Sequence, residues 1–364
     1  MRKLILNLHL YGALIAGIFV VIIGVTGSIM AFEDDIDRLT HPGLFHVDPQ
    51  GAPLPVTDLL KAAQKAYPGQ RIGTIRLPQR PTDAAQFNVK GPRGVFINPY
   101  TGAIIGDRDP VTFLGKIHQL HLRLLMTAAS SGKIGSNFVA GATAVLLFLV
   151  LSGIYLWWPV KRASVNWSAN ARRIHFDLHN TAGIYSAAFL LLLGVTGIAI
   201  RFDDDIETYL HQKAGTQKIA KNIPSVFQNG VTPITPDQGL QIALAALPGT
   251  QALAISIPGG PKASYLISLY YPEDLTPGGR SWANVDQFSG KVVSFQDSRT
   301  VASGTRAIIL NRATHTGDIY GYPTKVLVSL SSLMLVIQAI TGYYMWWKKL
   351  RVHQHREEPV KAVA

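Results

Sequence analysis

The 364-residue sequence contains no cysteine. This absence excludes a disulfide framework, thiolate zinc sites, cysteine-ligated iron–sulfur clusters and thiol nucleophiles. Charged residues are also scarce, at 15% of the chain against about 25% in typical soluble domains, whereas 48% of the residues are hydrophobic. The composition argues against an ordinary soluble enzyme, and any metal must be held by His, Asp, Glu or Met.

The sequence does contain four long runs without a charged residue. Each has at least the ~20 residues that a helix needs to cross a bilayer. The first run is too long for the apolar part of a signal peptide and is not followed by a small-residue cleavage site, so we expect it to be retained. The four predicted spans are residues 4–32, 134–160, 178–200 and 326–347.

The distribution of positive charge predicts the orientation of these spans. The net charge is +12, and 11 basic residues lie in the N-terminus, the 161–173 loop and the C-terminal tail. The segments 33–133 and 201–325 hold 12 and 11 basic residues against 9 and 10 acidic ones. By the positive-inside rule, both termini are cytoplasmic and both large segments are external. The charge therefore indicates topology and disfavours a nucleic-acid partner.

An internal repeat divides the chain into two halves. Leu-His at 8–9, Gly-Val-Thr-Gly at 24–27 and an acidic run at 32–36 all recur 170 residues later. Spans two and four both end in Gly-x-Tyr-x-Trp-Trp, at 153–158 and 342–347. Two repeats of two spans predict an α-helical membrane protein, a four-helix bundle with pseudo-twofold symmetry about the membrane normal.

The two external segments also correspond to each other. Each has an amphipathic helix pattern, at 56–66 and 236–246, followed by strand patterns. The strands are expected at 72–77, 86–89 and 95–97, and at 252–257, 265–270 and 282–286. We therefore predict two small external α+β modules. The expected division is span one at 1–33, module one at 34–112, an interfacial helix with span two at 113–160, a cytoplasmic loop at 161–173, span three at 174–201, module two at 202–304, an interfacial segment with span four at 305–348, and a cytoplasmic tail at 349–364.

Six of the eleven histidines lie at span entrances, where ionisable groups indicate function. His9 matches His179 in the repeat, and His121 matches His315, whereas His118 and His175 have no histidine counterpart. These six contrast with His41, His46, His211, His353 and His355, which we interpret as solvated.

Two facing imidazoles without carboxylate or thiolate partners favour axial ligation of a haem iron. Zinc would require a third or fourth ligand. Small residues lie 4, 7 and 18 positions after His9 and His179, on one narrow face, which suggests room for a porphyrin. The alternative is that small residues allow close helix packing and the histidines bond backbone carbonyls.

The histidines of the second pair cannot lie on the same continuous helix as the span that follows each of them. From His121 to Trp157 is 36 residues, or ~54 Å of continuous helix, against a hydrocarbon core of ~30 Å. Ser130, Ser131 and Gly132 supply a break in the first half, and Gly317, Gly321 and Pro323 supply one in the second. We expect His121 and His315 on short helices at the external interface.

These motifs, in this order and repeated once, resemble the PepSY-associated transmembrane family. The resemblance rests on Leu-His opening a span, Gly-Val-Thr-Gly near its end, the α+β module, the Leu-His-Leu-Arg entry at 120–123 and the Gly-x-Tyr-x-Trp-Trp ending. Members include bacterial inner-membrane ferric-siderophore reductases with two b-type haems. The resemblance implies that His9, His179, His121 and His315 are the axial ligands, with His118 and His175 as less favoured substitutes. No catalytic residue is assigned.

The function expected from this resemblance is a dihaem b-type oxidoreductase. It would pass electrons across the bilayer to a ferric siderophore or another ferric chelate and release ferrous iron. No dinucleotide-binding glycine motif follows a strand, so the donor would be a cytoplasmic carrier or the quinol pool. The alternatives are a non-enzymatic regulator that binds a protease or another envelope protein, a transporter of the chelate, and a different acceptor such as cupric ion.

Overall fold

The computed structural model describes residues 1–89, 93–108, 112–128 and 131–361. The chain forms two compact units, and each is assembled from segments that are distant in the sequence. The bundle unit contains Met1–Phe32, Lys116–Asp203 and Thr314–Ala364, and the sheet unit contains Glu33–Gly115 and Asp204–Ala313.

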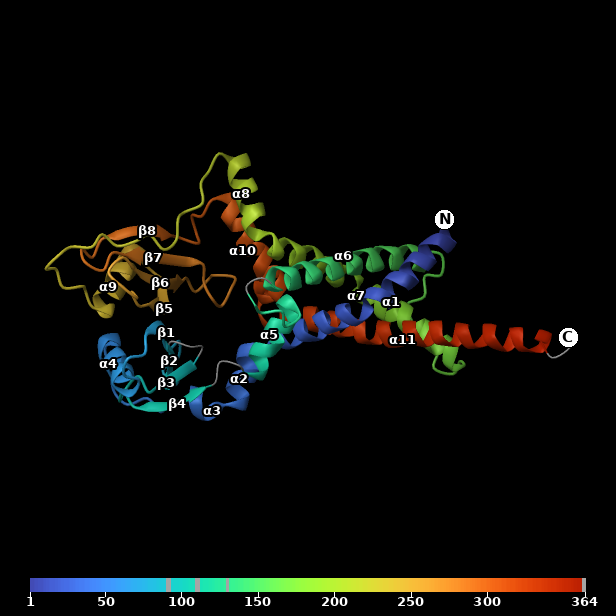
Figure 1. The fold of residues 1–364 in the computed structure, drawn as a ribbon, viewed down its shortest axis with the longest axis horizontal. Helices are drawn as coiled ribbons and strands as arrows, with labels where there is room; N and C mark the ends of the chain where they lie inside the picture. The colour runs from blue at the N-terminus through green and yellow to red at the C-terminus, as the bar shows by residue number, and fades with distance from the viewer. Residues whose placement is uncertain (90–92, 109–111, 129–130, 362–364) are drawn as a thin grey trace. The chain divides into compact units, whose positions relative to one another are not determined.

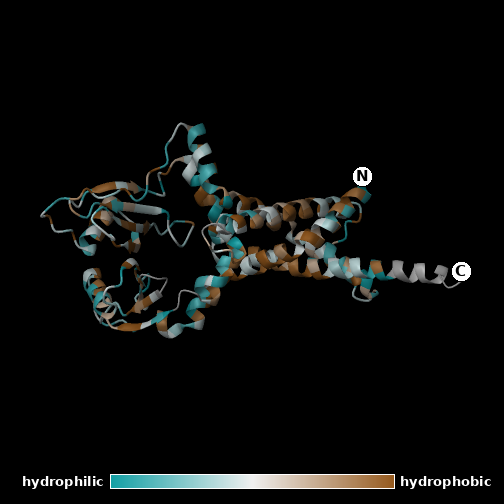
Figure 2. Ribbon diagram, viewed as in Figure 1, coloured by the Kyte–Doolittle hydropathy of each residue, from teal (hydrophilic) through white to brown (hydrophobic). Residues whose placement is uncertain are grey.

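Four long helices make the bundle unit, and they run side by side in Figure 1. All four are long and apolar enough to cross a membrane, as the brown colour along them in Figure 2 illustrates. The four predicted spans are therefore confirmed as helices, and the chain is a membrane protein. The helices are α1 (Arg2–Met30), α6 (Ser131–Trp157), α7 (Ala171–Arg201) and α11 (Tyr322–Lys361).

Helix α7 begins seven residues before the uncharged run at 178–200 and three residues before the expected third span at 174–201. The side chain of Asn170 accepts a hydrogen bond from the backbone N–H of Arg173 at 3.0 Å, which is a typical N-cap. The first two turns of α7 are polar, so the helix is longer than the apolar run alone indicates. As a result, His179 lies two turns inside α7 and not at its start.

Helices α1 and α7 each pack against both α6 and α11. The core between them is a layer of buried apolar side chains, in which Val20 and Leu190 occupy equivalent positions of the repeat. Two glycines allow α1 to approach α11 and α7 to approach α6 closely. A Cβ at Gly24 would lie 2.7 Å from Leu335, and a Cβ at Gly194 would lie 2.6 Å from Leu147. The pairing of helices agrees with a repeat of two spans, while the pseudo-twofold axis itself stays a prediction.

Two short helices carry the second pair of histidines, as the length argument predicts. They are α5 (Phe113–Arg123) and α10 (Ser303–Thr316). Helix α5 ends where Leu124 and Leu125 adopt positive φ, and α10 ends at Gly317, with φ of 77°. A 3₁₀ turn, η1 (Asp318–Tyr320), and Gly321 then lead into α11. Of the predicted breaks, Ser130 lies outside the described residues.

The sheet unit corrects the prediction of two separate small sheets. Its eight strands form one antiparallel sheet in the order β4-β3-β2-β1-β5-β6-β7-β8, because β1 of the first half pairs with β5 of the second. Each half contributes four strands and not three, since β4 and β8 were not predicted. The strands are β1 (Ile72–Arg76), β2 (Ala85–Val89), β3 (Arg93–Ile97), β4 (Ile104–Arg108), β5 (Gln251–Ser256), β6 (Tyr265–Tyr270), β7 (Ser281–Val285) and β8 (Val292–Gln296).

The helices of the sheet unit include two that match the sequence prediction residue for residue. These are α4 (Val56–Ala66) and α9 (Pro236–Ala246), whose apolar faces share one core with the sheet. The two acidic runs do not stand alone, because they begin helices, where carboxylates interact favourably with the helix dipole. The remaining helices are α2 (Glu33–Thr40), α3 (Pro42–Phe45) and α8 (Asp203–Ala214).

One carboxylate joins the two halves of the sheet unit. Asp237, in the first turn of α9, accepts hydrogen bonds from the backbone N–H groups of Val56 and Thr57 at 2.7 and 2.8 Å and from the Thr57 hydroxyl. It therefore caps the N-terminus of α4, which comes from the other half of the sequence.

Replacing Asp237 should loosen α4. We expect Asp237→Ala to leave these N–H groups without an acceptor and to lower the local opening free energy of α4 by about 1–3 kcal/mol. Hydrogen–deuterium exchange of the α4 peptide, followed by mass spectrometry in the full chain, measures this. Asp58→Ala is the control, because Asp58 lies exposed in the same helical turn and bonds the exposed side chain of Lys61 at 3.1 Å. Equal exchange in both variants would contradict the cross-repeat cap.

Candidate functional site

The structure brings the four favoured histidines together as two facing pairs. His9 of α1 and His179 of α7 have ring centroids 6.4 Å apart, with an angle of 80° between the ring planes. His121 of α5 and His315 of α10 have ring centroids 6.5 Å apart, with an angle of 51°. These are the pairs that the repeat predicts, and each pair lies within the bundle unit.

In the first pair, Nδ1 of each imidazole is bonded to a hydroxyl on the next helix. His9 Nδ1 lies 2.8 Å from Ser152 Oγ of α6, and His179 Nδ1 lies 3.1 Å from Thr341 Oγ1 of α11. A backbone oxygen, that of Gln338, is also 3.1 Å from His179 Nδ1. The Nε2 atoms take no part in these bonds.

The second pair repeats the arrangement on different helices. His121 Nδ1 lies 3.2 Å from Thr26 Oγ1 of α1 and 3.0 Å from the carbonyl oxygen of Ile23. His315 Nδ1 lies 3.0 Å from Thr196 Oγ1 of α7. Burial lowers the pKa of the His121 imidazole, so this ring is neutral at pH 7.

A glycine follows each of these hydroxyl residues, and each glycine lies against the Cε1 atom of the same histidine. At the second pair, a Cβ at Gly27 would lie 2.9 Å from His121 Cε1, and a Cβ at Gly197 would lie 3.0 Å from His315 Cε1. At the first pair the distances are longer, at 3.5 Å from Gly153 to His9 Cε1 and 3.6 Å from Gly342 to His179 Cε1. We call each hydroxyl residue with its glycine a socket. The sockets are Thr26-Gly27, Ser152-Gly153, Thr196-Gly197 and Thr341-Gly342.

Sequence reasoning used these dipeptides only as markers of the repeat and missed their role. The signal was present, because a hydroxyl followed by glycine recurs at 26 and 196 and again at 152 and 341. From the sequence alone, Gly27 and Gly197 are interpreted as small residues that leave space for a porphyrin on the helix face of His9 and His179. In the structure they contact the rings of His121 and His315. Ala16, in the same line of small residues, lies in the packed core.

The two substitute histidines have other surroundings. His175 lies one turn before His179, where its Nδ1 is 2.8 Å from the carbonyl oxygen of Ala171 and its ring stacks on Tyr344 at 3.8 Å. His118 lies one turn before His121 on α5. Neither is a member of a facing imidazole pair among the described residues.

One histidine interpreted as solvated is buried. His211 of α8 is 4% exposed, and its ring nitrogens lie 2.8 Å from Thr216 Oγ1 and 3.1 Å from Thr305 Oγ1. The interpretation of a solvated side chain is therefore wrong for this residue. The sequence around His211 gave no sign of burial, because its helix is short and polar. The side chains that bond His211 come from segments that follow α8 in the chain.

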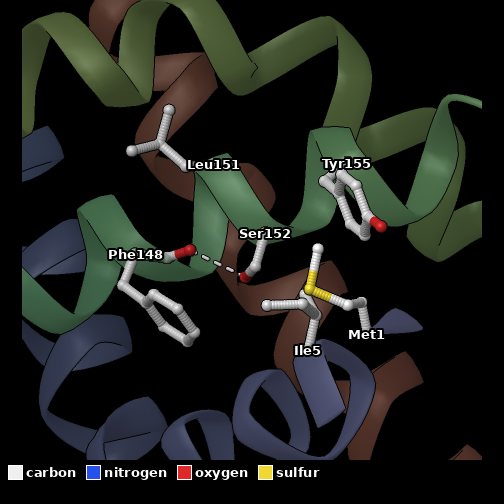
Figure 3. A pocket seen from close by; sticks show the side chains of 6 residues that line it. All are labelled: Met1, Ile5, Phe148, Leu151, Ser152 and Tyr155. Atoms are coloured by element: carbon white, nitrogen blue, oxygen red, sulfur yellow. Dashed lines mark hydrogen bonds between the residues drawn. The ribbon is translucent and has the colours of Figure 1, made fainter. Parts of the chain in front are cut away.

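A small apolar hollow lies beside the first pair, between α1 and α6. Its volume is about 310 Å³, and Ser152, which bonds His9, forms part of its wall (Figure 3). This volume is at the lower end of the roughly 300–1,000 Å³ that small-molecule pockets have. The lining residues are Met1, Ile5, Phe148, Leu151, Ser152 and Tyr155.

A buried carboxylate stabilises the start of α7 near His179. Asp177 is fully buried, and its Oδ1 lies 3.0 Å from Arg173 Nε and 3.4 Å from Arg162 Nε. Its Oδ2 accepts a hydrogen bond from the backbone N–H of Asn166 at 3.2 Å. These contacts hold the loop between α6 and α7 against the helix that carries His179.

The fold and site together define a polytopic membrane protein with four apolar helices, two facing imidazole pairs and a separate antiparallel sheet. A family model for the PepSY-associated TM region matches residues 6–349. The chain belongs to this family, and the match includes all four sockets and all four paired histidines. A search of curated proteins found no match.

The glycines lie closer to the histidine rings at the second pair than at the first. At Gly27 a methyl group would lie well inside the ~3.5–4.0 Å of ordinary carbon contacts, whereas at Gly153 it would lie 3.5 Å from His9. We expect Gly27→Ala to displace His121 from Thr26, at a cost of about 1–3 kcal/mol, and Gly153→Ala to be tolerated. The measurement is the rate at which diethyl pyrocarbonate modifies each histidine, read by mass spectrometry.

The matched control is Gly141→Ala on α6, where, among the described residues, a Cβ would have no atom of another helix within 4 Å. It should leave His121 reactivity unchanged. The close contact would be refuted if His121 reacted at the same rate in Gly27→Ala as in the parent protein.

Proposed function

We propose that each histidine pair ligates the iron of one haem b, and that the protein is a dihaem oxidoreductase. The observation that carries the proposal is the separation of the facing rings. A metal–imidazole bond of about 2.1 Å and a ring-centre-to-nitrogen distance of about 1.1 Å place two axial ligands of one metal about 6.4 Å apart. The two pairs, at 6.4 and 6.5 Å, have this separation.

The donor set supports haem over zinc. Among the described residues, no three His, Asp or Glu side chains gather as a possible metal site, so each centre offers two ligands. Two opposed imidazoles suit a planar group that supplies the other four ligands, whereas zinc sites use three or four protein ligands. Each socket supports the edge of an imidazole with a glycine, and the hollow beside Ser152 lies next to the first pair.

Two haems b would supply reversible one-electron chemistry at two depths of the bundle. His9 and Thr26, which bonds His121, lie 17 residues apart on α1, or about 26 Å along the helix. That span is comparable with the ~30 Å hydrocarbon core. Between the two pairs lies the buried apolar layer that includes Val20 and Leu190. The arrangement therefore suits electron transfer across a membrane.

The acceptor proposed is a ferric siderophore or another ferric chelate in the periplasm of a bacterium. One electron converts chelated ferric iron to ferrous iron, which siderophores hold more weakly. A membrane quinol or a reduced cytoplasmic carrier supplies that electron at the other side. The basic N-terminus, loop and tail support cytoplasmic termini, and the resemblance to siderophore reductases supports the acceptor.

The first expected result concerns haem content. The purified protein should carry two non-covalent haems b per chain, because no Cys-x-x-Cys-His attachment motif exists in a chain without cysteine. His9→Ala and His179→Ala should remove one spectral component, and His121→Ala and His315→Ala the other. The pyridine haemochrome assay and reduced-minus-oxidised spectra measure both.

His175→Ala is the control, since its ring stacks on Tyr344 and is not in a facing pair. It should retain both haems. The assignment fails if the parent protein binds one haem or none, or if His9→Ala and His315→Ala lose the same component.

The second expected result concerns electron transfer. Protein reduced under anaerobic conditions should be reoxidised by a ferric siderophore in stopped flow, and ferrous iron should appear in a ferrozine trap. Ferric citrate, several siderophores and cupric ion are compared, and His121→Ala should slow the reaction at least tenfold. Reoxidation no faster than the oxygen-free blank for all iron chelates would remove the reductase proposal and favour a regulatory role.

A further inference from the structure

All four socket hydroxyls have already donated their single proton. Each Oγ donates a short hydrogen bond to the carbonyl oxygen one turn earlier on its own helix, and Figure 3 draws this bond for Ser152. The same pattern occurs on four different helices. The bonds are Ser152 to Phe148 at 2.7 Å, Thr26 to Ile22 at 2.7 Å, Thr196 to Leu192 at 2.7 Å and Thr341 to Ile337 at 2.6 Å.

The use of that proton determines the direction of the bond to histidine. A hydroxyl has one O–H donor, so a hydroxyl that donates to a carbonyl is left as an acceptor toward its other neighbour. Nδ1 of the histidine must then be the donor. The carbonyls of Ile23 and Gln338, within 3.0 and 3.1 Å of His121 and His179, lead to the same conclusion, since a carbonyl oxygen only accepts.

We infer that Ser152, Thr341, Thr26 and Thr196 are positioning residues, which hold the four paired histidines as Nδ1–H tautomers and set the donor strength of their Nε2 atoms. The first part concerns the chain alone. The second part, that these hydroxyls tune the potentials of the two centres, rests on the proposed function.

The expected electronic effect has a definite sign. An acceptor on Nδ1–H raises the basicity of the imidazole, and a more basic axial ligand favours ferric over ferrous iron. Loss of the hydroxyl should therefore move the midpoint potential of that centre to more positive values. Because a hydroxyl is neutral, the ligands stay neutral imidazoles, unlike histidines bonded to a carboxylate.

The sockets also link the two pairs mechanically. Helix α1 carries His9 and, 17 residues later, the socket for His121; α7 carries His179 and the socket for His315. Each of these helices thus supplies a ligand to one pair and an acceptor to the other. A shift of α1 would alter both centres together.

The chain offers a matched control for the hydroxyl. Thr143 of α6 is half-buried, and its Oγ1 donates to the Val139 carbonyl at 2.8 Å, as the socket residues do. No histidine bonds it among the described residues. Thr143→Val therefore removes the same back-bond without touching a socket.

The first test reads the tautomer without any haem. Nitrogen-15 NMR of the full-length apoprotein, labelled at histidine, should show Nδ1-protonated rings for His9, His121, His179 and His315. Nε2-protonated rings at these positions would overturn the inference. This test stands even if the protein binds no haem, so it separates failure of the inference from failure of the proposed function.

The second test reads the potentials of the holoprotein by spectroelectrochemistry. The variants remove the hydroxyls of Ser152 and Thr196, because at Thr26 and Thr341 the carbonyls of Ile23 and Gln338 would still accept from Nδ1–H. Thr196→Val should shift only the component lost in His315→Ala to more positive potential, and Ser152→Ala only the component lost in His9→Ala. Haem retention against apomyoglobin should weaken roughly 10–100-fold in each. Thr196→Ser and Ser152→Thr should retain both readouts of the parent protein, and Thr143→Val should change neither. Unshifted potentials in haem-loaded Thr196→Val and Ser152→Ala, or an equal shift in Thr143→Val, would show that the hydroxyls are merely structural.

Discussion

The hydrogen bond from a histidine on one helix to a back-bonded hydroxyl on the next is the interaction around which the bundle is built. It occurs four times, and each time it requires the helices to approach closely enough for an imidazole to fit between them. At the second pair the adjacent glycine satisfies that requirement, because a side chain at Gly27 or Gly197 would overlap the ring, whereas at Gly153 and Gly342 a Cβ would make ordinary contact. Polar groups in an apolar bundle are costly unless they are paired, so both partners of each bond are needed.

Confining these polar contacts to two depths leaves the middle of the bundle apolar. Val20, Leu190 and Leu335 pack between the levels of the two histidine pairs. Close packing there depends on Gly24 and Gly194, which allow α1 to approach α11 and α7 to approach α6. The same helices therefore separate the two histidine pairs and hold them at a defined spacing.

The sheet unit shows a different use of the repeat. Its two halves do not remain separate, because β1 and β5 present open edges that pair with each other and produce one continuous sheet. Edge strands left unpaired invite association with other chains, and pairing the two halves removes two such edges. Asp237 adds a second tie, since it caps a helix of the opposite half.

The sequence by itself determined the parts of this protein that depend on local pattern. Long apolar runs marked the four helices of the bundle, the spacing of apolar residues located α4 and α9, and the repeat paired His9 with His179 and His121 with His315. Only the tertiary structure decided which helix supplies each socket, why His211 is buried and how the strands of the two halves join. Periodicity reports which face of an element is apolar. It carries no information on which distant segment will lie against a given side chain, and a hydrogen bond between helices depends on that neighbour.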